Sequence, residues 1–388
     1  MAFGFLFVIC HSDFEIIIMN TYPRKRSDYW LSLAVFGLIV FGLIMIYSVS
    51  KYYSLELTNG LSDKYFLKKQ LITVIIGLLV WIVVQAIDYR YWKKYAGTMF
   101  FITFGLLLLP IILRPFGITS AGRWIIIADF SFQPAELAKL TFIFYLAGLF
   151  AEKGRSLKEV TKLFWPFISV VGIIALMMLV QKDLGTLSIF IIISASLFVV
   201  AGAPVGQIFG GLGIGGALMW LAIKLEPYRM QRFITFLNPG SDSLSSGYHI
   251  QNALIAIGSG GLFGLGFGQS KQKYLYLPEA HTDSIFAIIC EELGMLRATV
   301  IICIFVFIAL RGFKIAKSAP DNFARLVAIG VTVWIFAQMS INIAAMLALL
   351  PLTGIPLPFI SYGGTSLIVL LVAIGVLTNI SKSQTYEK

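Results

Sequence analysis

The chain has 388 residues, of which 58% are hydrophobic and only 13% are charged, and its mean hydropathy is +0.87. Soluble proteins carry about a quarter charged residues, so this composition excludes a soluble globular protein and is typical of a polytopic membrane protein. The net charge of +11 does not indicate nucleic-acid binding, because basic residues of membrane proteins gather in cytoplasmic loops and near anionic headgroups.

The first residues, MAFGFLFVIC, form an apolar run that is too short to span a membrane and lacks the basic leading region of a signal peptide. HSDFE then interrupts the run. We therefore predict that Met19 is the natural start and that residues 1–18 are an upstream overhang. The expected cytoplasmic tails are residues 1–28 and 381–388.

Apolar segments long enough to span a membrane, which takes about 20 residues, recur along the chain. They predict an all-α polytopic fold with a single transmembrane domain over residues 29–380. The ten expected helices are 29–50, 67–87, 96–113, 134–152, 163–181, 185–202, 205–225, 284–310, 324–350 and 362–380.

The distribution of Lys and Arg predicts that both termini are cytoplasmic. The outer side then holds the loop 114–133, a KDLG break at 182–185, a long loop at 226–283 and a Pro/Gly-rich run at 351–364. A loop as long as 226–283 is more often functional than idle. Its apolar part, 250–267, predicts a re-entrant or interfacial helix that ends in a flexible glycine segment, next to a cavity open to the outer face.

The turn PEAHTD, residues 278–283, precedes the eighth apolar segment. A carboxylate at the entry of a membrane helix is costly, because a low dielectric disfavours its charged form. Asp283 is therefore a candidate general base. Two simpler alternatives are that Asp283 caps the following helix or that it faces bulk water.

Several basic residues lie at the predicted outer ends of spans. Glu136 and Lys139 share a helix face, either as a self-neutralising structural pair or as a cavity wall in which Lys139 faces an anionic ligand. Arg123 precedes Trp124, which indicates either an interfacial anchor or a bidentate phosphate contact. Arg229 could snorkel or bind lipid phosphate, as could Arg232.

Other charges have less specific interpretations. Lys273 flanks the acidic turn and is expected to be solvated, and Lys182 and Asp183 are expected to neutralise each other. Arg297 falls inside a span, where it could form an ion pair with Asp183 or with the acidic residues at 291–292. The three histidines and three cysteines lack metal-ligand spacing, so no metal site is predicted.

The chain resembles the SEDS family of bacterial membrane proteins, RodA, FtsW and SpoVE, over residues 27–381. The matching segments are Gly122-Arg123-Trp124, FQPAELAKL from Phe132, DLGT from Asp183, YRMQRFITFLNP from Tyr228, IAIGSGGLFGLGFGQS from Ile255, YLPEAHTD from Tyr276, EELG from Glu291 and GIPLPFISYGGTS from Gly354. The run SKQK–YLPEAHTD looks more like FtsW than RodA. Three positions depart from the pattern: Lys182 replaces a proline, Ser284 an aromatic residue and Arg297 a small residue.

This resemblance implies a peptidoglycan glycosyltransferase in the bacterial cytoplasmic (inner) membrane, acting in cell division or cell-shape maintenance. It would polymerise lipid II at the outer face and release undecaprenyl pyrophosphate, with Asp283 as the catalytic residue. The expected substrate-binding residues are Arg123, Lys139, Arg229, Arg232 and Lys273, and the expected supporting residues are Glu136, Glu279, His281 and Ser361.

The resemblance also implies partners, namely a class B penicillin-binding protein (a transpeptidase), membrane proteins of the divisome or elongasome, and membrane lipids, with no nucleic acid. It implies no built-in cofactor and leaves a divalent cation open. Two other functions stay open. Broken helices and intramembrane charges also fit a transporter that flips lipid II, and a non-catalytic division scaffold is the second alternative.

Overall fold

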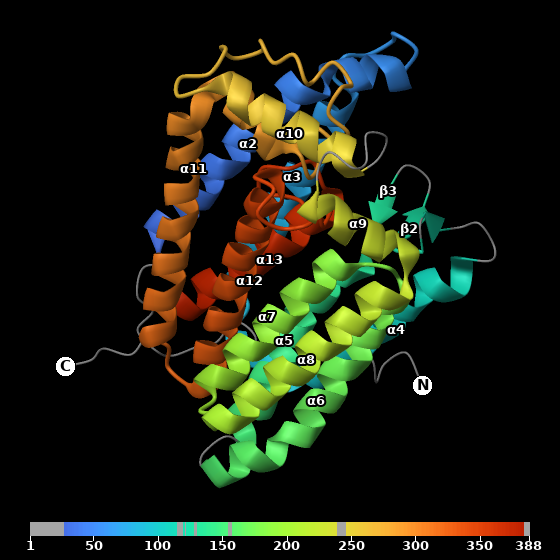
Figure 1. Ribbon diagram of the computed structural model, residues 1–388. Coiled ribbons are helices and arrows are strands. Elements are labelled where there is room, and N and C mark those ends of the chain that lie inside the picture. The colour runs from blue at the N-terminus through green and yellow to red at the C-terminus, as the bar shows by residue number, and fades with distance from the viewer. Residues whose placement is uncertain are drawn as a thin grey trace, which may run out of the picture.

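The computed structural model describes residues 27–114, 119–120, 122–127, 130–153, 157–238 and 246–383. Within these ranges the chain is largely helical, as predicted (Figure 1). The proposed overhang, nearly all of the N-terminal tail and the end of the C-terminal tail lie outside the described residues.

The ten helices expected from hydropathy correspond to helices of the structure. These are α2 (Tyr29–Leu57), α3 (Tyr65–Val84), α4 (Tyr89–Leu113), α5 (Pro134–Lys153), α6 (Leu157–Val180), α7 (Leu184–Val200), α8 (Val205–Leu225), α11 (Ile285–Lys317), α12 (Asn322–Met346) and α13 (Gly364–Lys382). Among the described residues, eight helices are long and apolar enough to cross a membrane. α7 and the apolar part of α8 are shorter.

Aspartates begin several of these helices, because their side chains accept the first free backbone N–H groups. Asp28 accepts from Leu31 at the start of α2, and Asp321 accepts from Ala324 at the start of α12. At the break before α7, Asp183 accepts from both the N–H and the hydroxyl of Thr186. The expected pairing of Asp183 with the preceding lysine is therefore wrong.

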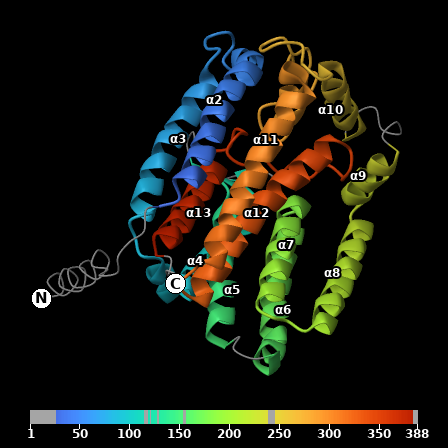
Figure 2. The ribbon, with the colours of Figure 1, turned by 90° about the vertical axis from the view of Figure 1, so that its left-hand side faces the viewer.

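The core of the bundle consists of α5, α12 and α13, which are buried over most of their length. α12 packs against α11, α5 and α7, and α13 packs against α3. α2 and α3 lie at one edge of the bundle and α8 at the opposite edge, and α11 runs between them (Figure 2).

A small antiparallel sheet interrupts the otherwise helical fold, which hydropathy did not predict. Its strands are β1 (Thr119–Ser120), β2 (Trp124–Ile127) and β3 (Phe130–Phe132), in the order β1-β2-β3 with Ile125 opposite Phe132. The hydroxyl of Thr365 on α13 donates to the main-chain oxygen of Ser131 at 3.1 Å. The sheet is thus attached to the start of α13.

The long loop predicted at 226–283 contains two helices, α9 (Pro227–Leu237) and α10 (Ser246–Gly260). The glycine segment that follows α10 is not free, because its backbone pairs with α11. The N–H groups of Leu265 and Gly266 donate to the main-chain oxygens of Glu291 and Glu292, at 2.9 and 3.0 Å respectively. α11 makes room for this pairing through a non-helical conformation at Gly294.

Candidate active site

Asp283 lies at the end of a turn, residues 278–284, that is closed by its own hydrogen bonds. The main-chain oxygen of Glu279 accepts from the N–H groups of Thr282 and Ser284, at 3.1 and 3.2 Å. Oγ of Ser284 donates to the main-chain oxygen of Pro278 at 2.9 Å. The turn is therefore fixed before α11 begins.

The carboxylate of Asp283 does not cap α11. The N-cap residue is Ser284, and Oδ1 of Asp283 accepts instead from Oγ1 of Thr282 at 2.9 Å. The side chain is half-buried rather than open to bulk water. Burial raises the pKa of Asp283 to about 6, and the charge of Glu279 adds to the rise, whereas the Thr282 hydrogen bond and the charge of Arg232 oppose it.

The loop between α12 and α13, residues 347–363, approaches the same carboxylate. The amide of Asn342 donates to the main-chain oxygens of Asp283 and Ile355, both at 2.7 Å, and so joins the turn to the loop. Gly354 has φ +67°, and a Cβ atom there would stand 3.5 Å from Oδ2 of Asp283. The backbone of the loop thus passes directly beside the carboxylate.

Of the two predicted supporting residues, His281 joins the turn to the loop, and Ser361 stabilises the loop internally. The N–H of Tyr362 donates to the main-chain oxygen of His281 at 2.9 Å, and Oγ of Ser361 accepts from the N–H of Leu357 at 2.8 Å. The ring of His281 is buried 4.5 Å from that of Phe66, between ring centroids. Burial lowers the pKa of His281, so the imidazole is uncharged at neutral pH.

Two of the predicted cations, Arg229 and Arg232, lie one turn apart on α9, and Arg232 approaches this site. NH1 of Arg232 donates to the main-chain oxygen of Leu352 at 2.8 Å, and its charge acts on Asp283. NH2 of Arg229 donates to the oxygen of Leu179 at 2.7 Å. The planar guanidinium of arginine can bind a phosphate through two parallel N–H groups, so both residues remain candidate phosphate ligands.

Two other predicted substrate-binding cations make contacts within the protein. Nε of Arg123 donates to the main-chain oxygen of Gln181 at 2.8 Å, and NH2 donates to that of Lys182. Lys273 is buried, and its Nζ lies 2.9 Å from Oε1 of Glu292. The expectation that Lys273 is solvated is therefore wrong, and this geometry gives no support to substrate binding by either residue.

Glu136 and Lys139 form the predicted pair, with Nζ 2.8 Å from Oε1, and both side chains are buried. Nζ of Lys139 also donates to Oε1 of Gln338 at 3.0 Å, and Nε2 of Gln338 donates to the oxygen of Pro356 at 3.0 Å. This geometry favours a structural ion pair over a cavity wall that faces an anionic ligand. Lys139 is connected to the loop 347–363, which lies beside Asp283, only through Gln338.

The sequence interpretation overlooked three polar side chains that organise the site. Gln338 and Asn342 lie four residues apart in the apolar α12, and polar side chains on one face of a membrane helix are a recognisable signal for interhelical hydrogen bonds. His249 on α10 contacts Ser284 next to the candidate base. No spacing pattern around His249 predicts this contact.

Two further charge assignments need correction. Arg297 does not pair with an acidic residue, because NH1 donates to the main-chain oxygens of Phe263 and Leu293, at 3.0 and 3.2 Å. Nζ of Lys182 lies 3.0 Å from Oε1 of Glu226, so Lys182 joins the α6–α7 break to the junction of α8 and α9.

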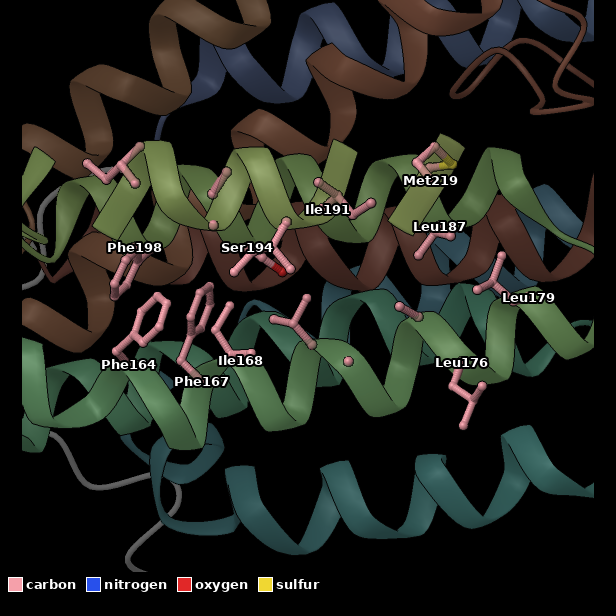
Figure 3. A pocket seen from close by; sticks show the side chains of 18 of the residues that line it. Phe164, Phe167, Ile168, Leu176, Leu179, Leu187, Ile191, Ser194, Phe198 and Met219 are labelled. Atoms are coloured by element: carbon pink, nitrogen blue, oxygen red, sulfur yellow. The ribbon is translucent and has the colours of Figure 1, made fainter. Parts of the chain in front are cut away.

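A separate apolar chamber of about 550 Å³ lies between α6, α7 and α8 (Figure 3). Phe164 and Phe167 of α6 and Phe198 of α7 lie near one end of it, and Leu179 and Leu187 lie near the other. Glu226 and Arg229, at the start of α9, belong to its lining. The chamber therefore meets the cationic face of α9.

The fold and the site together define the class of protein. It is a polytopic helical membrane protein with a half-buried carboxylate and a nearby arginine, Arg232, at one end of its bundle. In the part of the chain that the structure describes, no cluster of three or more His, Cys, Asp or Glu residues could hold a metal ion.

The chain belongs to the FtsW/RodA/SpoVE family, whose model, described as "Cell cycle protein", matches residues 29–386. It is 38% identical over 369 residues to "Stage V sporulation protein E" of Bacillus subtilis (strain 168), covering 94% of this chain and 100% of that protein. It is 37% identical to "Probable peptidoglycan glycosyltransferase FtsW" of Geobacter sp. (strain M18), covering 92% and 98%. The chain is thus a multi-pass protein of the bacterial inner membrane.

Solved structures share the fold. A chain from "Structural coordination of polymerization and crosslinking by a peptidoglycan synthase complex" superimposes with a TM-score of 0.73. The alignment covers 93% of this chain and 99% of that chain, at 24% sequence identity. At this identity the similarity establishes the fold alone, which agrees with the predicted polytopic helical architecture.

Proposed function

We propose that the protein is a peptidoglycan glycosyltransferase that polymerises lipid II at the outer face of the inner membrane. The observation that carries the proposal is the environment of Asp283, which is half-buried, does not cap α11 and lies beside the backbone of Gly354. The names of the curated relatives support the reaction class.

In this reaction the 4-hydroxyl of a GlcNAc residue attacks C1 of a lipid-linked MurNAc. The carboxylate of Asp283 takes the hydroxyl proton as the new C1–O bond forms. The bond from C1 to the pyrophosphate oxygen breaks with its electron pair, and undecaprenyl pyrophosphate leaves. With its pKa raised to about 6, Asp283 is mostly ionised at neutral pH and more basic than an ordinary aspartate.

The arginines of α9 would stabilise the negative charge of the leaving pyrophosphate. Arg232 acts electrostatically on Asp283, and Arg229 lies one turn before it along the same helix. Because Arg is always charged and can grip a phosphate through two N–H groups, it suits this role.

The orientation and the partners are part of the same proposal. Both termini would be cytoplasmic, so that α9, α10 and the turn 278–284 face outward. A class B penicillin-binding protein would supply transpeptidation, and the FtsW-like motifs favour a role in division. The similarity of fold to a chain of a peptidoglycan synthase complex is consistent with such a partner.

The test is polymerisation by purified full-length protein supplied with lipid II and its transpeptidase partner, followed by gel analysis of glycan strands. Asp283→Asn should reduce the rate by about 100-fold or more, the scale of a lost general base, while lipid II binding is retained. Asp63→Asn, in the turn between α2 and α3, is the matched control and should be unaffected. Normal strand synthesis by folded Asp283→Asn protein would refute Asp283 as the base, whereas absence of strand synthesis by the native protein would favour a transporter.

A further inference from the structure

The apolar chamber between α6, α7 and α8 is long and narrow. On α6 its lining extends from Phe164 to Val180, a rise of about 24 Å at 1.5 Å per residue. On α8 its lining residues recur every three or four positions from Gln207 to Met219, as expected for one helix face. With a volume of about 550 Å³ over this length, the chamber fits an extended chain better than a compact ligand.

α8 leaves the chamber hollow because its sequence lacks side chains where a packed helix would insert them. Gly211 and Gly215 line the chamber, and a Cβ atom added at either would meet no heavy atom within 4 Å. Opposite them, α6 and α7 contribute almost entirely apolar groups. Ser194 is a polar exception, but its hydroxyl donates to the main-chain oxygen of Phe190 at 2.6 Å.

One end of the chamber is charged. Arg229 lines it, and Arg232 follows one turn later on α9, where its charge acts on Asp283. Glu226 also lines this end, but Nζ of Lys182 lies 3.0 Å from its carboxylate. Because this ion pair offsets the acidic charge, the end of the chamber favours an anion.

We propose that this chamber binds the polyisoprenyl chain of the lipid-linked sugar donor, with its pyrophosphate lying along the Arg229–Arg232 face of α9. The inference rests on the proposed function for the identity of the donor. The apolar length of the chamber receives the hydrocarbon, the arginines receive the anionic head, and C1 of the attached sugar is directed toward Asp283. The part of the chain that the chamber does not hold lies in the bilayer.

Binding is tested separately from catalysis. Full-length protein in nanodiscs is photolabelled with a diazirine-bearing polyisoprenyl pyrophosphate, and labelled peptides are identified by mass spectrometry. We expect labels on the lining of α6, α7 and α8. Unlabelled polyisoprenyl pyrophosphate should compete, whereas phosphatidylglycerol should not. The label should persist in Asp283→Asn protein, so loss of polymerisation and loss of binding are distinguishable.

Matched glycine substitutions on α8 locate the chain. Gly211→Leu and Gly215→Leu fill the chamber and should reduce labelling by about 10-fold or more, which is the consequence of removing a hydrophobic site. Gly213→Leu is the control, because Gly213 is exposed, has open space around it and does not line the chamber. Ala175→Phe blocks the opposite wall from α6 and serves if an α8 variant fails to fold.

Three outcomes would overturn the proposal. Equal competition by phosphatidylglycerol would assign the chamber to bilayer lipid. Equal labelling of the Gly211→Leu, Gly213→Leu and Gly215→Leu proteins would place the chain elsewhere. Labels confined to helices other than α6, α7 and α8 would do the same.

Discussion

Nε2 of His249 lies 2.6 Å from Oγ of Ser284, so α10 is joined to the residue that directly follows Asp283. Because Ser284 donates its own proton to the oxygen of Pro278, it must accept from His249, which places the imidazole proton on Nε2. Burial, together with the charge of Arg232, lowers the pKa of His249 to about 4, so this neutral form persists at neutral pH.

The chain of hydrogen bonds from His249 to Ser284 to Pro278 should position the turn that carries Asp283. Ser284→Ala leaves the N–H of His249 and the main-chain oxygen of Pro278 without their shared partner. We therefore expect the free energy of unfolding to fall by about 1–3 kcal/mol. His249→Gln, which keeps an N–H donor, should retain more activity than His249→Ala. Thermal unfolding and strand synthesis measure both effects. Equal activity of the two His249 variants would argue against a positioning role.

Asp283 should make the folded protein less stable above about pH 6 than below about pH 4. Its pKa rises from 3.8 to about 6 on folding, so between these values the folded state binds more protons than the unfolded state. The free energy of unfolding therefore falls as pH rises through this range, by about 3 kcal/mol in total. Asp283→Asn removes this cost and should stabilise the protein at pH 8.

The comparison of pH values provides the control for this prediction. Near pH 4 Asp283 is protonated in the folded state, so most of the stability difference between the variant and the native protein should disappear. Thermal unfolding in one detergent at both pH values measures the difference. Lower stability of Asp283→Asn at pH 8 would show that burial does not raise the pKa of this carboxyl.

The membrane helices could be predicted from sequence because each span must satisfy its backbone internally and present apolar side chains to lipid. The local pairing of Glu136 with Lys139 was predictable for a similar reason, since residues three apart share a helix face. The position of Asp283 at the entry of an apolar helix also stood out.

Contacts between distant segments could not be predicted in this way. The partner of Lys182 is Glu226, forty-four residues away, and Arg297 bonds to main-chain oxygens rather than to acidic side chains. The pairing of the glycine segment after α10 with α11 depends on the conformation of Gly294, which no apolar periodicity reveals. Local pattern thus identified the candidate base but not the residues that hold it.

The buried pair of Glu136 and Lys139 should behave as a coupled unit. Glu136→Gln leaves the Lys139 ammonium buried with Gln338 as its remaining hydrogen-bond acceptor, and removing one member of a buried ion pair costs about 3–5 kcal/mol. The double variant Glu136→Gln/Lys139→Met should lose less stability than the sum of the single variants. A double-mutant cycle on thermal unfolding measures the coupling, and additive losses would contradict it.

Lys273 should act on the site by anchoring a loop rather than by touching substrate. Its ammonium lies 2.9 Å from Glu292 and donates to the oxygen of Gly268 at 2.6 Å, while Ser48 of α2 donates to the same Glu292. Lys273→Met leaves the Glu292 carboxylate buried without its cation, which is costly. We expect faster amide hydrogen exchange over residues 268–283, because local opening there becomes easier.

The same variant separates anchoring from binding. If Lys273 anchors the loop, Lys273→Met should lower polymerisation together with hydrogen-exchange protection, because the turn that carries Asp283 follows the anchored segment directly. The double variant Lys273→Met/Glu292→Met removes both buried charges and should recover part of the protection. If Lys273 only binds pyrophosphate, its replacement should instead raise KM for lipid II and leave amide hydrogen exchange over residues 268–283 unchanged. That second pattern would return Lys273 to the substrate-binding group.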